Sequence, residues 1–412
     1  MKHNISLEEA QDLLLEKTIR PGESHVPLID ALGRILSQDI VARENSPFFD
    51  RSPLDGYALL ASDTGSATSA QPVRLRVLEE IPAGYVAVCQ VTSGTAIKVM
   101  TGAPIPQGAD VVVKYEEVER EGEIVTIFEP LKTRTNVVYS GEDVKKGEVV
   151  ARQGILVTPA LIGLLAGLGI GSVPVYQRIK VAILSTGDEL IDLNESLRPG
   201  KIYDSNRHTL QARCLELGVE PVMLGNVADQ QNQVADRIRE GLKQADVVIT
   251  TGGVSVGDYD VVQDAAKEAG AEIIFWKVDI KPGSPILAAT KDQKLIVGLS
   301  GNPVAALITF DLLVIPFLKK MMGRRKYLYS KIQGTLLDGF GKSSEQRRFL
   351  RARFLMENGN TLVRLTGIQN NSALKSMMEC NLFVDVPAGS GPLNPGDVVS
   401  AYIIGNIDNV DE

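Results

Sequence analysis

The feature that most constrains this fold is a series of short apolar segments between residues 180 and 318. The segments VAILST, PVMLGNVA, DVVITT, AEIIFWKV and KLIVGL are rich in β-branched and aliphatic residues. Between them, residues 205–217, 230–244 and 261–269 and the segment that begins at Asn302 show helical spacing. Short strands that alternate with amphipathic helices are typical of a doubly wound, mainly parallel α/β sheet.

Unusual residues follow the predicted strands directly. In open parallel sheets, ligands bind beyond the carboxyl ends of the strands, and glycine-rich turns and helix N-termini there bind anions. We therefore predict an anion site that contains Gly252, Gly253, Ser255, Gly257, Gly301 and Asn302. Carboxylates at the same edge suit Mg²⁺, so we predict a metal site from Glu189, Asp229 and Asp258. The alternative is that these acids only cap helices.

Two lysines lie at and just beyond the end of the apolar segment AEIIFWKV. Lys277 and Lys281 are four residues apart, and the alternation of a strand would place both on one face. Paired cations near an anion site suit an oxyanion. Two ordinary surface lysines are the alternative.

The rest of the chain divides into three regions by sequence pattern. Residues 6–19 and 27–37 have leucine and isoleucine at helical spacing, and helical character returns at Thr158, a candidate N-cap followed by Pro159. Residues 46–146 and the last part of the chain read as short strands, the latter as a small sandwich or barrel. The predicted domains are a discontinuous helical linking domain (1–45 and 147–178), an inserted β-rich domain (46–146), an α/β domain (179–326) and a C-terminal β-barrel-like domain (327–412).

Composition excludes some classes of protein. The net charge of −8 over 412 residues argues against a general nucleic-acid binder. The three cysteines form no CxxC pair, which indicates a reducing compartment rather than a disulfide framework. The N-terminus lacks a signal-peptide pattern. The most apolar segment, 303–318, contains Asp311 and is shorter than the roughly 20 residues that span a bilayer. We expect a cytoplasmic protein without a membrane anchor.

The inserted domain adds three candidates, each flanked by glycine or proline. They are Asp55 in SPLDGYA (52–58), Thr101 in MTGAPIPQGADVVVK (100–114) and Asp143 in GEDVKKGE (141–148). On local grounds, an ordinary turn explains each of them.

Together with STGDEL (185–190), GKIYDSN (200–206), GGVSVGDYD (252–260), KPG (281–283) and GNPVAA (301–306), these segments resemble the molybdopterin molybdotransferases, the MoeA family, which includes the E domain of gephyrin. The resemblance runs over nearly the whole chain. It implies four domains in an elongated homodimer whose clefts are shared between protomers. It also implies that the protein inserts molybdate into adenylylated molybdopterin with Mg²⁺ and releases AMP, with the molybdopterin adenylyltransferase as a candidate partner.

The resemblance also assigns residues. It places Asp55, Thr101, Asp143, Lys277 and Lys281 among the catalytic positions, and it matches the three metal candidates. It adds to the substrate-binding residues Pro282, Arg347, Arg351 and Ser372.

Two positions depart from the family pattern, because Ser284 stands where a second lysine is common and Ser300 where a proline is common. Loss of a cation weakens the electrostatic argument for an oxyanion pocket. Tungstate is therefore an alternative to molybdate as the substrate. The alternative functions are a molybdopterin adenylyltransferase and a non-catalytic molybdopterin-binding scaffold.

Overall fold

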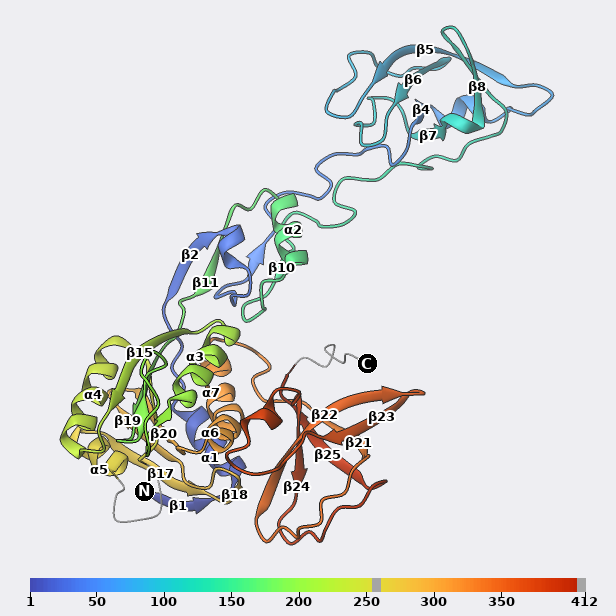
Figure 1. Ribbon diagram of the computed structural model, residues 1–412. Coiled ribbons are helices and arrows are strands. Elements are labelled where there is room, and N and C mark those ends of the chain that lie inside the picture. The colour runs from blue at the N-terminus through green and yellow to red at the C-terminus, as the bar shows by residue number, and fades with distance from the viewer. Residues whose placement is uncertain (254–260, 406–412) are drawn as a thin grey trace.

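The computed structural model describes residues 1–253 and 261–405 and shows an elongated molecule (Figure 1). An α/β module and a C-terminal barrel lie side by side at one end. A small linking module follows, and an inserted β block forms the far end. Ser255, Gly257 and Asp258 lie outside the described residues.

The α/β module contains a seven-stranded sheet in the order β1-β17-β19-β20-β16-β12-β15. Its strands are parallel except β19, which is antiparallel to both of its neighbours. This confirms the doubly wound, mainly parallel sheet and adds two strands that the sequence pattern misses, β1 and β19. The strands are β1 (Lys2–Ile5), β12 (Lys180–Thr186), β15 (Glu220–Val227), β16 (Val247–Thr251), β17 (Glu272–Val278), β19 (Leu287–Lys291) and β20 (Lys294–Leu299).

Alternate side chains of the strands bury on opposite faces of the sheet, as pleated strands require. In β12, Val181 and Ile183 join a core with α1, α3, α6 and α7, whereas Ala182 and Leu184 join a core with α4 and α5. The helices are α1 (Leu7–Glu16), α3 (Ser205–Leu217), α4 (Gln231–Gln244), α5 (Val261–Glu268), α6 (Pro303–Thr309) and α7 (Ile315–Met321).

The apolar segment from Pro303 forms the buried helix that the sequence predicts. A π-helical segment, Phe310–Val314, joins α6 to α7, and all five of its residues are buried. Asp311, within it, accepts hydrogen bonds from Nε and Nη2 of Arg213 on α3, at 3.1 and 2.6 Å. A buried carboxylate that is paired in this way satisfies the rule that buried charges need partners.

The linking module differs from its prediction in two respects. The pattern at 27–37 predicts a helix, but the structure has β2 (Glu23–Pro27) and one 3₁₀ turn, Leu28–Ala31. Pro27 is extended and Gly33 has a φ of +74°, so neither residue continues a helix. Residues 2–16, predicted to belong to this module, instead join the α/β module through β1 and α1.

The helix after Thr158 is confirmed, with Thr158 as N-cap and Pro159 at its start. The remaining elements are β3 (Ile40–Val41), β10 (Val149–Ala151), α2 (Pro159–Gly167) and β11 (Ser172–Tyr176).

The β block contains a six-stranded sheet in the order β7-β4-β6-β5-β9-β8, which encloses apolar cores around Tyr57 and Val99. Its strands are β4 (Gly56–Leu59), β5 (Val73–Ile81), β6 (Thr95–Val99), β7 (Val111–Lys114), β8 (Val118–Glu121) and β9 (Ile124–Ile127). Short 3₁₀ turns cover Ala61–Thr64 and Tyr115–Glu117.

The C-terminal sheet closes on itself, because β22 pairs with both β23 and β24. This confirms the predicted barrel. A short strand from the α/β region, β18 (Ile280–Lys281), joins it by pairing with β22. The other elements are β21 (Lys331–Leu336), β22 (Arg347–Glu357), β23 (Asn360–Leu365), the 3₁₀ turn Leu374–Met377, β24 (Leu382–Val386) and β25 (Val398–Ile403).

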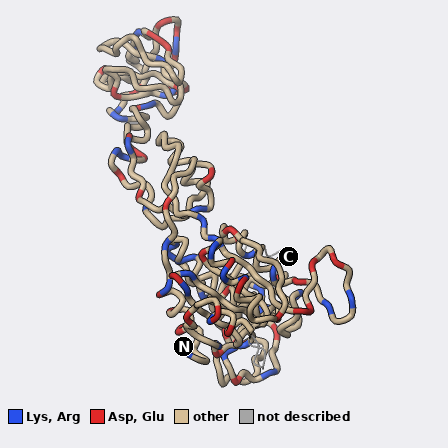
Figure 2. The backbone as a smooth tube through the Cα atoms, turned by 90° about the vertical axis from the view of Figure 1, so that its left-hand side faces the viewer, with Lys and Arg blue, Asp and Glu red and all other residues tan. Residues whose placement is uncertain are grey.

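Charges of both signs are interspersed over every module (Figure 2). Cys89, Cys214 and Cys380 are all free thiols. In the described ranges, no helix is both long enough and apolar enough to cross a membrane.

Candidate functional site

Four parallel strands bring the predicted residues to one edge of the α/β sheet. β15, β12, β16 and β20 are successive neighbours, so their carboxyl ends meet. Asn206, near the start of α3, ties two of these ends together. Its Nδ2 donates to Oγ1 of Thr251 at 2.7 Å and to the carbonyl of Gly301 at 2.8 Å. A cavity of about 70 Å³ opens there, lined by Thr186, Glu189, Leu190, Ile202, Tyr203, Asp204, Ser205, Asn206, Thr251, Gly252, Gly301 and Pro303.

The turn after β16 needs glycine for both space and conformation. Gly252 has a φ of +96°, and a Cβ there would lie 2.2 Å from the carbonyl oxygen of Thr186. Gly253 has a φ of +63°, and its Cβ would meet Thr186 and Val262 at 2.9 and 3.0 Å. The Gly252 N–H donates to the carbonyl of Leu299. Gly252 therefore serves this site by close backbone approach, not by donating its own N–H.

Replacing Gly252 with alanine is expected to disrupt this turn and reduce substrate binding. The new Cβ would collide with backbone that cannot move aside cheaply, and a left-handed alanine costs about 1–2 kcal/mol by itself. Substrate affinity, from a binding titration, and the thermal midpoint should both fall. The matched control is Gly163→Ala in α2, where nothing lies within 4 Å of the new Cβ. Equal behaviour of the two variants would contradict the steric argument.

Asp229 is the most perturbed acid at this edge. Burial raises the pKa of its carboxyl, the charges of Glu189 and Asp188 add to this, and the nearby Thr186 hydroxyl opposes it. Oδ1 of Asp229 and Oγ1 of Thr186 are both buried, and in the described part of the chain neither has a partner at ordinary hydrogen-bond geometry. A cation here would satisfy the orphaned carboxylate oxygen and lower the repulsion with Glu189.

The chemistry of Glu189 and Asp229 would suit a Mg²⁺ ion that substrate phosphates also bind. Within the described ranges, no group of three or more His, Cys, Asp or Glu side chains could hold a metal. Mg²⁺ keeps several waters and commonly binds one or two carboxylates plus substrate phosphates. Glu189 and Asp229 match that donor set. Asp258, the third candidate, belongs to the undescribed segment.

The first backbone N–H groups of α6 are not free to bind an anion. Pro303 lacks an N–H, and the N–H of Val304 donates to the carbonyl of Asn371 in the C-terminal barrel. The N–H of Asn302 donates to Oγ of Ser300 at 3.2 Å, an acceptor that a proline at position 300 would lack. The helix start therefore contributes fewer donors to an anion than the sequence predicts.

Ser372 belongs to a loop that touches α6, and Arg351 holds this loop in place. Arg351 is 1% exposed. Its guanidinium donates to Oγ of Ser376 and to the carbonyls of Ile368 and Asn370, at 2.8, 2.8 and 3.2 Å. The family resemblance implies that Arg351 binds substrate. The structure instead buries it under the loop that presents the exposed Ser372.

Arg347 is also committed within the protein. It forms a two-point ion pair with Asp385, at 2.7 and 2.8 Å, and it donates to Glu8 of α1 and to the Tyr402 hydroxyl. These bonds join the barrel to α1. The expected contact of Arg347 with substrate therefore competes with three protein partners.

The prediction that Lys277 and Lys281 share one strand face is wrong. Lys277 has a φ of +66°, which breaks the alternation, and Lys281 belongs to β18 in the barrel sheet. The turn after Lys281 nevertheless lies against α6. Pro282 is buried, and a Cβ on Gly283 would lie 2.3 Å from Cγ2 of Thr309. This turn and the Ser372 loop thus both pack on α6.

In the β block, Asp55 and Thr101 come together. The Thr101 N–H and hydroxyl both donate to Oδ1 of Asp55, at 2.7 and 2.8 Å, and they hold the pKa of this exposed carboxyl below its usual value. Asp143 lies on a neighbouring segment, where its N–H donates to the carbonyl of Ser46. Arg51 forms isolated β-bridges with Pro104, near Thr101, and with Val138, near Asp143, and so connects the two segments. The three predicted residues therefore lie on adjoining segments of one block.

Sequence reasoning missed several polar residues of the cavity. Thr186 and Thr251 end apolar strands, and Asp204 caps α3 by accepting from the Arg207 N–H. The signal for Asn206 was its place in GKIYDSN at a helix start, but its reach to two strand ends depends on how α3 packs.

Family models match three consecutive regions of the chain. The "MoeA N-terminal region (domain I and II)" matches residues 5–169, the "Probable molybdopterin binding domain" residues 182–320 and the "MoeA C-terminal region (domain IV)" residues 333–404. Fold and site together define a multidomain protein built around a molybdopterin-binding type of α/β module. The chain belongs to the MoeA family.

Individual relatives support this over the full length. The chain is 37% identical over 390 residues to the molybdopterin molybdenumtransferase of Bacillus subtilis (strain 168), covering 93% of this chain and 91% of the relative. The Staphylococcus aureus (strain Mu50) protein of the same name is 34% identical, with 98% and 96% covered. The crystal structure of a molybdopterin biosynthesis MoeA protein from Pyrococcus horikosii is similar with a TM-score of 0.86, 31% identity and 98% and 100% coverage.

Proposed function

We propose that this chain inserts molybdenum from molybdate into adenylylated molybdopterin and releases AMP. The observation that carries the proposal is the strand-end site: an orphaned acid, a glycine turn and two loops that meet at α6. It occurs in a chain that matches molybdopterin molybdenumtransferases over more than nine-tenths of their length.

Each part of the site has a task in this reaction. Cleavage of the phosphoanhydride leaves additional negative charge on the departing AMP and on the pterin phosphate. The tight turn at Gly252 packs directly on the Thr186 carbonyl, and Asn206 fixes this turn relative to Gly301, so the strand ends around the phosphate site are held together. Lys281 and Ser372, from the two loops that pack on α6, supply a charge and a hydroxyl for the oxyanion, and Lys277 supplies a second cation near β18.

Glu189 and Asp229, with Asp258, would hold Mg²⁺. The ion would neutralise charge on the phosphoanhydride oxygens. The carboxylates themselves fix the side of the cavity on which the phosphates bind.

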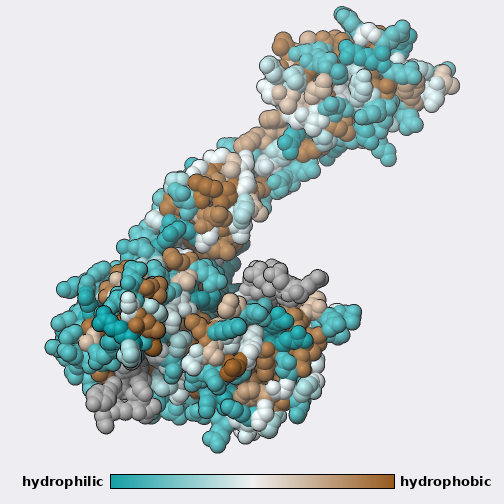
Figure 3. Space-filling view, viewed as in Figure 1, coloured by the Kyte–Doolittle hydropathy of each residue, from teal (hydrophilic) through white to brown (hydrophobic). Residues whose placement is uncertain are grey.

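The site is shared between two subunits of a homodimer in this proposal. In one chain the β block with Asp55, Thr101 and Asp143 lies at the far end of the molecule from the α/β module (Figure 1). A second subunit related by a two-fold axis could bring its β block to this module. Apolar surface gathers on the linking module (Figure 3), whose exposed apolar side chains are Ile29, Leu32, Val41, Val149, Ile155 and Leu156. Burial of this surface would stabilise a dimer.

The decisive experiment supplies adenylylated molybdopterin, Mg²⁺ and either molybdate or tungstate, and follows AMP release and metal incorporation. Oxyanion-dependent AMP release supports the proposal. Turnover of ATP with free molybdopterin, in the absence of molybdate, would instead identify a molybdopterin adenylyltransferase. Tight binding of the adenylylated pterin without cleavage would identify a scaffold. We further propose a cytoplasmic location, where the adenylyltransferase could hand over its product.

Replacing Lys281 with alanine is expected to raise the molybdate concentration for half-maximal AMP release by about tenfold, since one charge-assisted contact is lost. Ser284→Lys, which adds a cation in the same turn, should lower it. Lys326→Ala, at an exposed position in the segment before the barrel, controls for net charge. An unchanged molybdate requirement in both turn variants would place the oxyanion elsewhere.

A further inference from the structure

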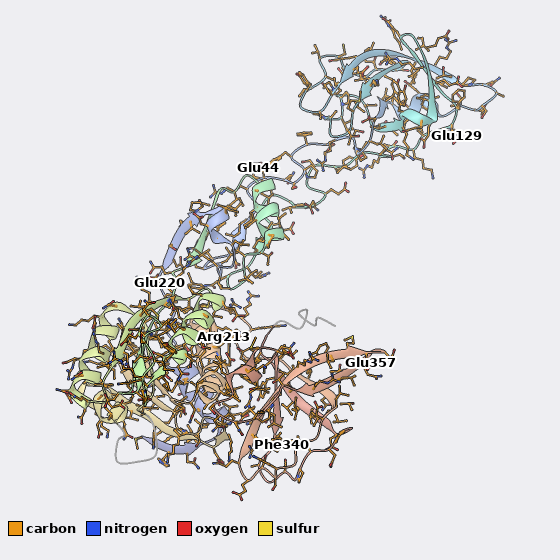
Figure 4. The ribbon with its side chains drawn as sticks, in the orientation of Figure 1. Glu44, Glu129, Arg213, Glu220, Phe340 and Glu357 are labelled. Atoms are coloured by element: carbon orange, nitrogen blue, oxygen red, sulfur yellow. The ribbon has the colours of Figure 1, made fainter. Side chains whose placement is uncertain are left out.

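A second cavity lies where α3, α7 and the C-terminal barrel meet. Its volume is about 210 Å³, and its polar lining consists of Arg213, Glu216, Lys319, Arg324 and Tyr329, with Ile404 among its apolar walls. Figure 4 shows Arg213 at this junction, beside the barrel. None of the residues assigned to the reaction lines it.

Two carboxylates near this cavity, those of Asp311 and Glu216, are bonded to Arg213. Arg213 donates to Oδ1 of Asp311 from two of its nitrogens, at 3.1 and 2.6 Å, and it also bonds to Glu216. One arginine thus faces two acids. These three side chains carry a net charge of −1, and Lys319 and Arg324 bring the group to +1.

Neither Lys319 nor Arg324 forms a close ion pair with a described residue, although the charge of Asp311 acts on Lys319. In the described part of the chain, no carboxylate lies within 4.0 Å of the Lys319 ammonium or the Arg324 guanidinium. Nε of Arg324 is buried, and its N–H has no hydrogen-bond acceptor among these residues. Buried donors that lack an acceptor are costly, so the hydrogen-bonding capacity of Arg324 is not fully used within the described residues.

Neither cation is needed to cap α7. The last carbonyls of that helix, on Leu318, Lys319 and Lys320, accept from the backbone N–H groups of Met322, Arg324 and Gly323. Burial lowers the pKa of both side chains. The charges of Arg324 and Arg213 lower the pKa of Lys319 further, and the charge of Asp311 opposes this. The charges of the two side chains therefore repel each other, and an anion in the cavity that they line would reduce this repulsion.

We propose that this cavity binds a small tetrahedral oxyanion of the phosphate or sulfate type, held by Lys319 and Arg324. The volume is below the range of about 300–1,000 Å³ that suits larger organic ligands, so a nucleotide is excluded by size. Tyr329, whose ring lies 4.2 Å from Nζ of Lys319, forms part of the same wall. The bound anion would join α7 to the segment that enters the barrel, and so stabilise the junction of the two modules.

The test is titration of the full-length protein with inorganic phosphate and with sulfate at constant ionic strength, against chloride. Thermal unfolding and calorimetry are read out together. We expect a saturable rise in the thermal midpoint, because a ligand that binds only the folded state stabilises it. Arg324→Gln should raise the half-saturating phosphate concentration about tenfold or more. Lys319→Gln provides a second variant if Arg324→Gln does not fold. Arg325→Gln, an exposed neighbour outside the cavity, should leave phosphate binding unchanged.

Acidic residues follow Gly405 in the sequence, so the titration is repeated with Asp408→Asn, Asp411→Asn and Glu412→Gln combined. Saturable binding in either background that the cavity variants weaken supports the proposal. Absence of saturable binding in both backgrounds overturns it, as does equal binding by Arg324→Gln, Lys319→Gln and the wild type, which would assign the anion to another site.

Discussion

Mixing Asp55→Ala subunits with Glu189→Ala subunits is expected to restore AMP release to roughly a quarter of the wild-type rate. Each homodimer carries the same lesion in both of its sites and should be inactive. In a heterodimer, one composite site collects both lesions and the other has neither. Random exchange of equal amounts makes about half of the dimers heterodimers, and each of these has one intact site of two.

The physical basis is the separation of the two lesions within one chain. Asp55 lies in the β block and Glu189 in the α/β module, with the linking module between them (Figure 1). Exchange must be confirmed independently, for example with subunits carrying different affinity tags. The control mixes Glu189→Ala with Asp229→Ala, two lesions in one module, and should recover nothing. Complete exchange without recovery in the Asp55 mixture would show that each site is built within one chain.

Replacing Asp311 with alanine should destabilise the protein by about 3–5 kcal/mol, because removal of one partner leaves the Arg213 charge partly buried and short of an acceptor. Asp311 is 1% exposed and receives two hydrogen bonds from Arg213. The free energy of unfolding of the module that contains α3 and α7, from denaturant titration, measures the effect.

The matched comparison removes both charges at once. Arg213→Met combined with Asp311→Leu fills similar space and leaves no buried charge, so its stability should lie much closer to the wild type. A loss below about 1 kcal/mol for Asp311→Ala would mean that water reaches the pair and screens it.

The sequence predicts the α/β module well because each strand and its following helix are local patterns. The sequence pattern did not predict strand β19, because its segment, Leu287–Lys291, contains two alanines and no β-branched residue before Thr290. It is a strand through its pairing with β17 and β20, which a local pattern does not record. The false helix at 27–37 has the opposite cause. Its apolar spacing reflects burial in the linking module, while Pro27 and Gly33 determine the backbone.

The acids at the sheet edge were predictable because the ends of parallel strands must meet. The cations were not, since the places of Lys281 and Arg351 depend on contacts between modules. Lys281 lies in a strand that joins another sheet, and Arg351 turns inward to three loop acceptors. No spacing rule along the chain distinguishes an arginine that binds substrate from one that supports a loop.

The short strand β18 has a mechanical consequence. The backbone that leaves the α/β sheet at Val278 is hydrogen-bonded into the barrel by Ile280 and Lys281, and it returns to pack on α6 at Gly283. The barrel is thus fastened to the α/β module at two points on α6, near Thr309 and at the Val304 N–H, which donates to Asn371. A substitution deep in the barrel that shifts β22 would therefore displace the Lys281 ammonium through the backbone, without altering any residue of the site itself.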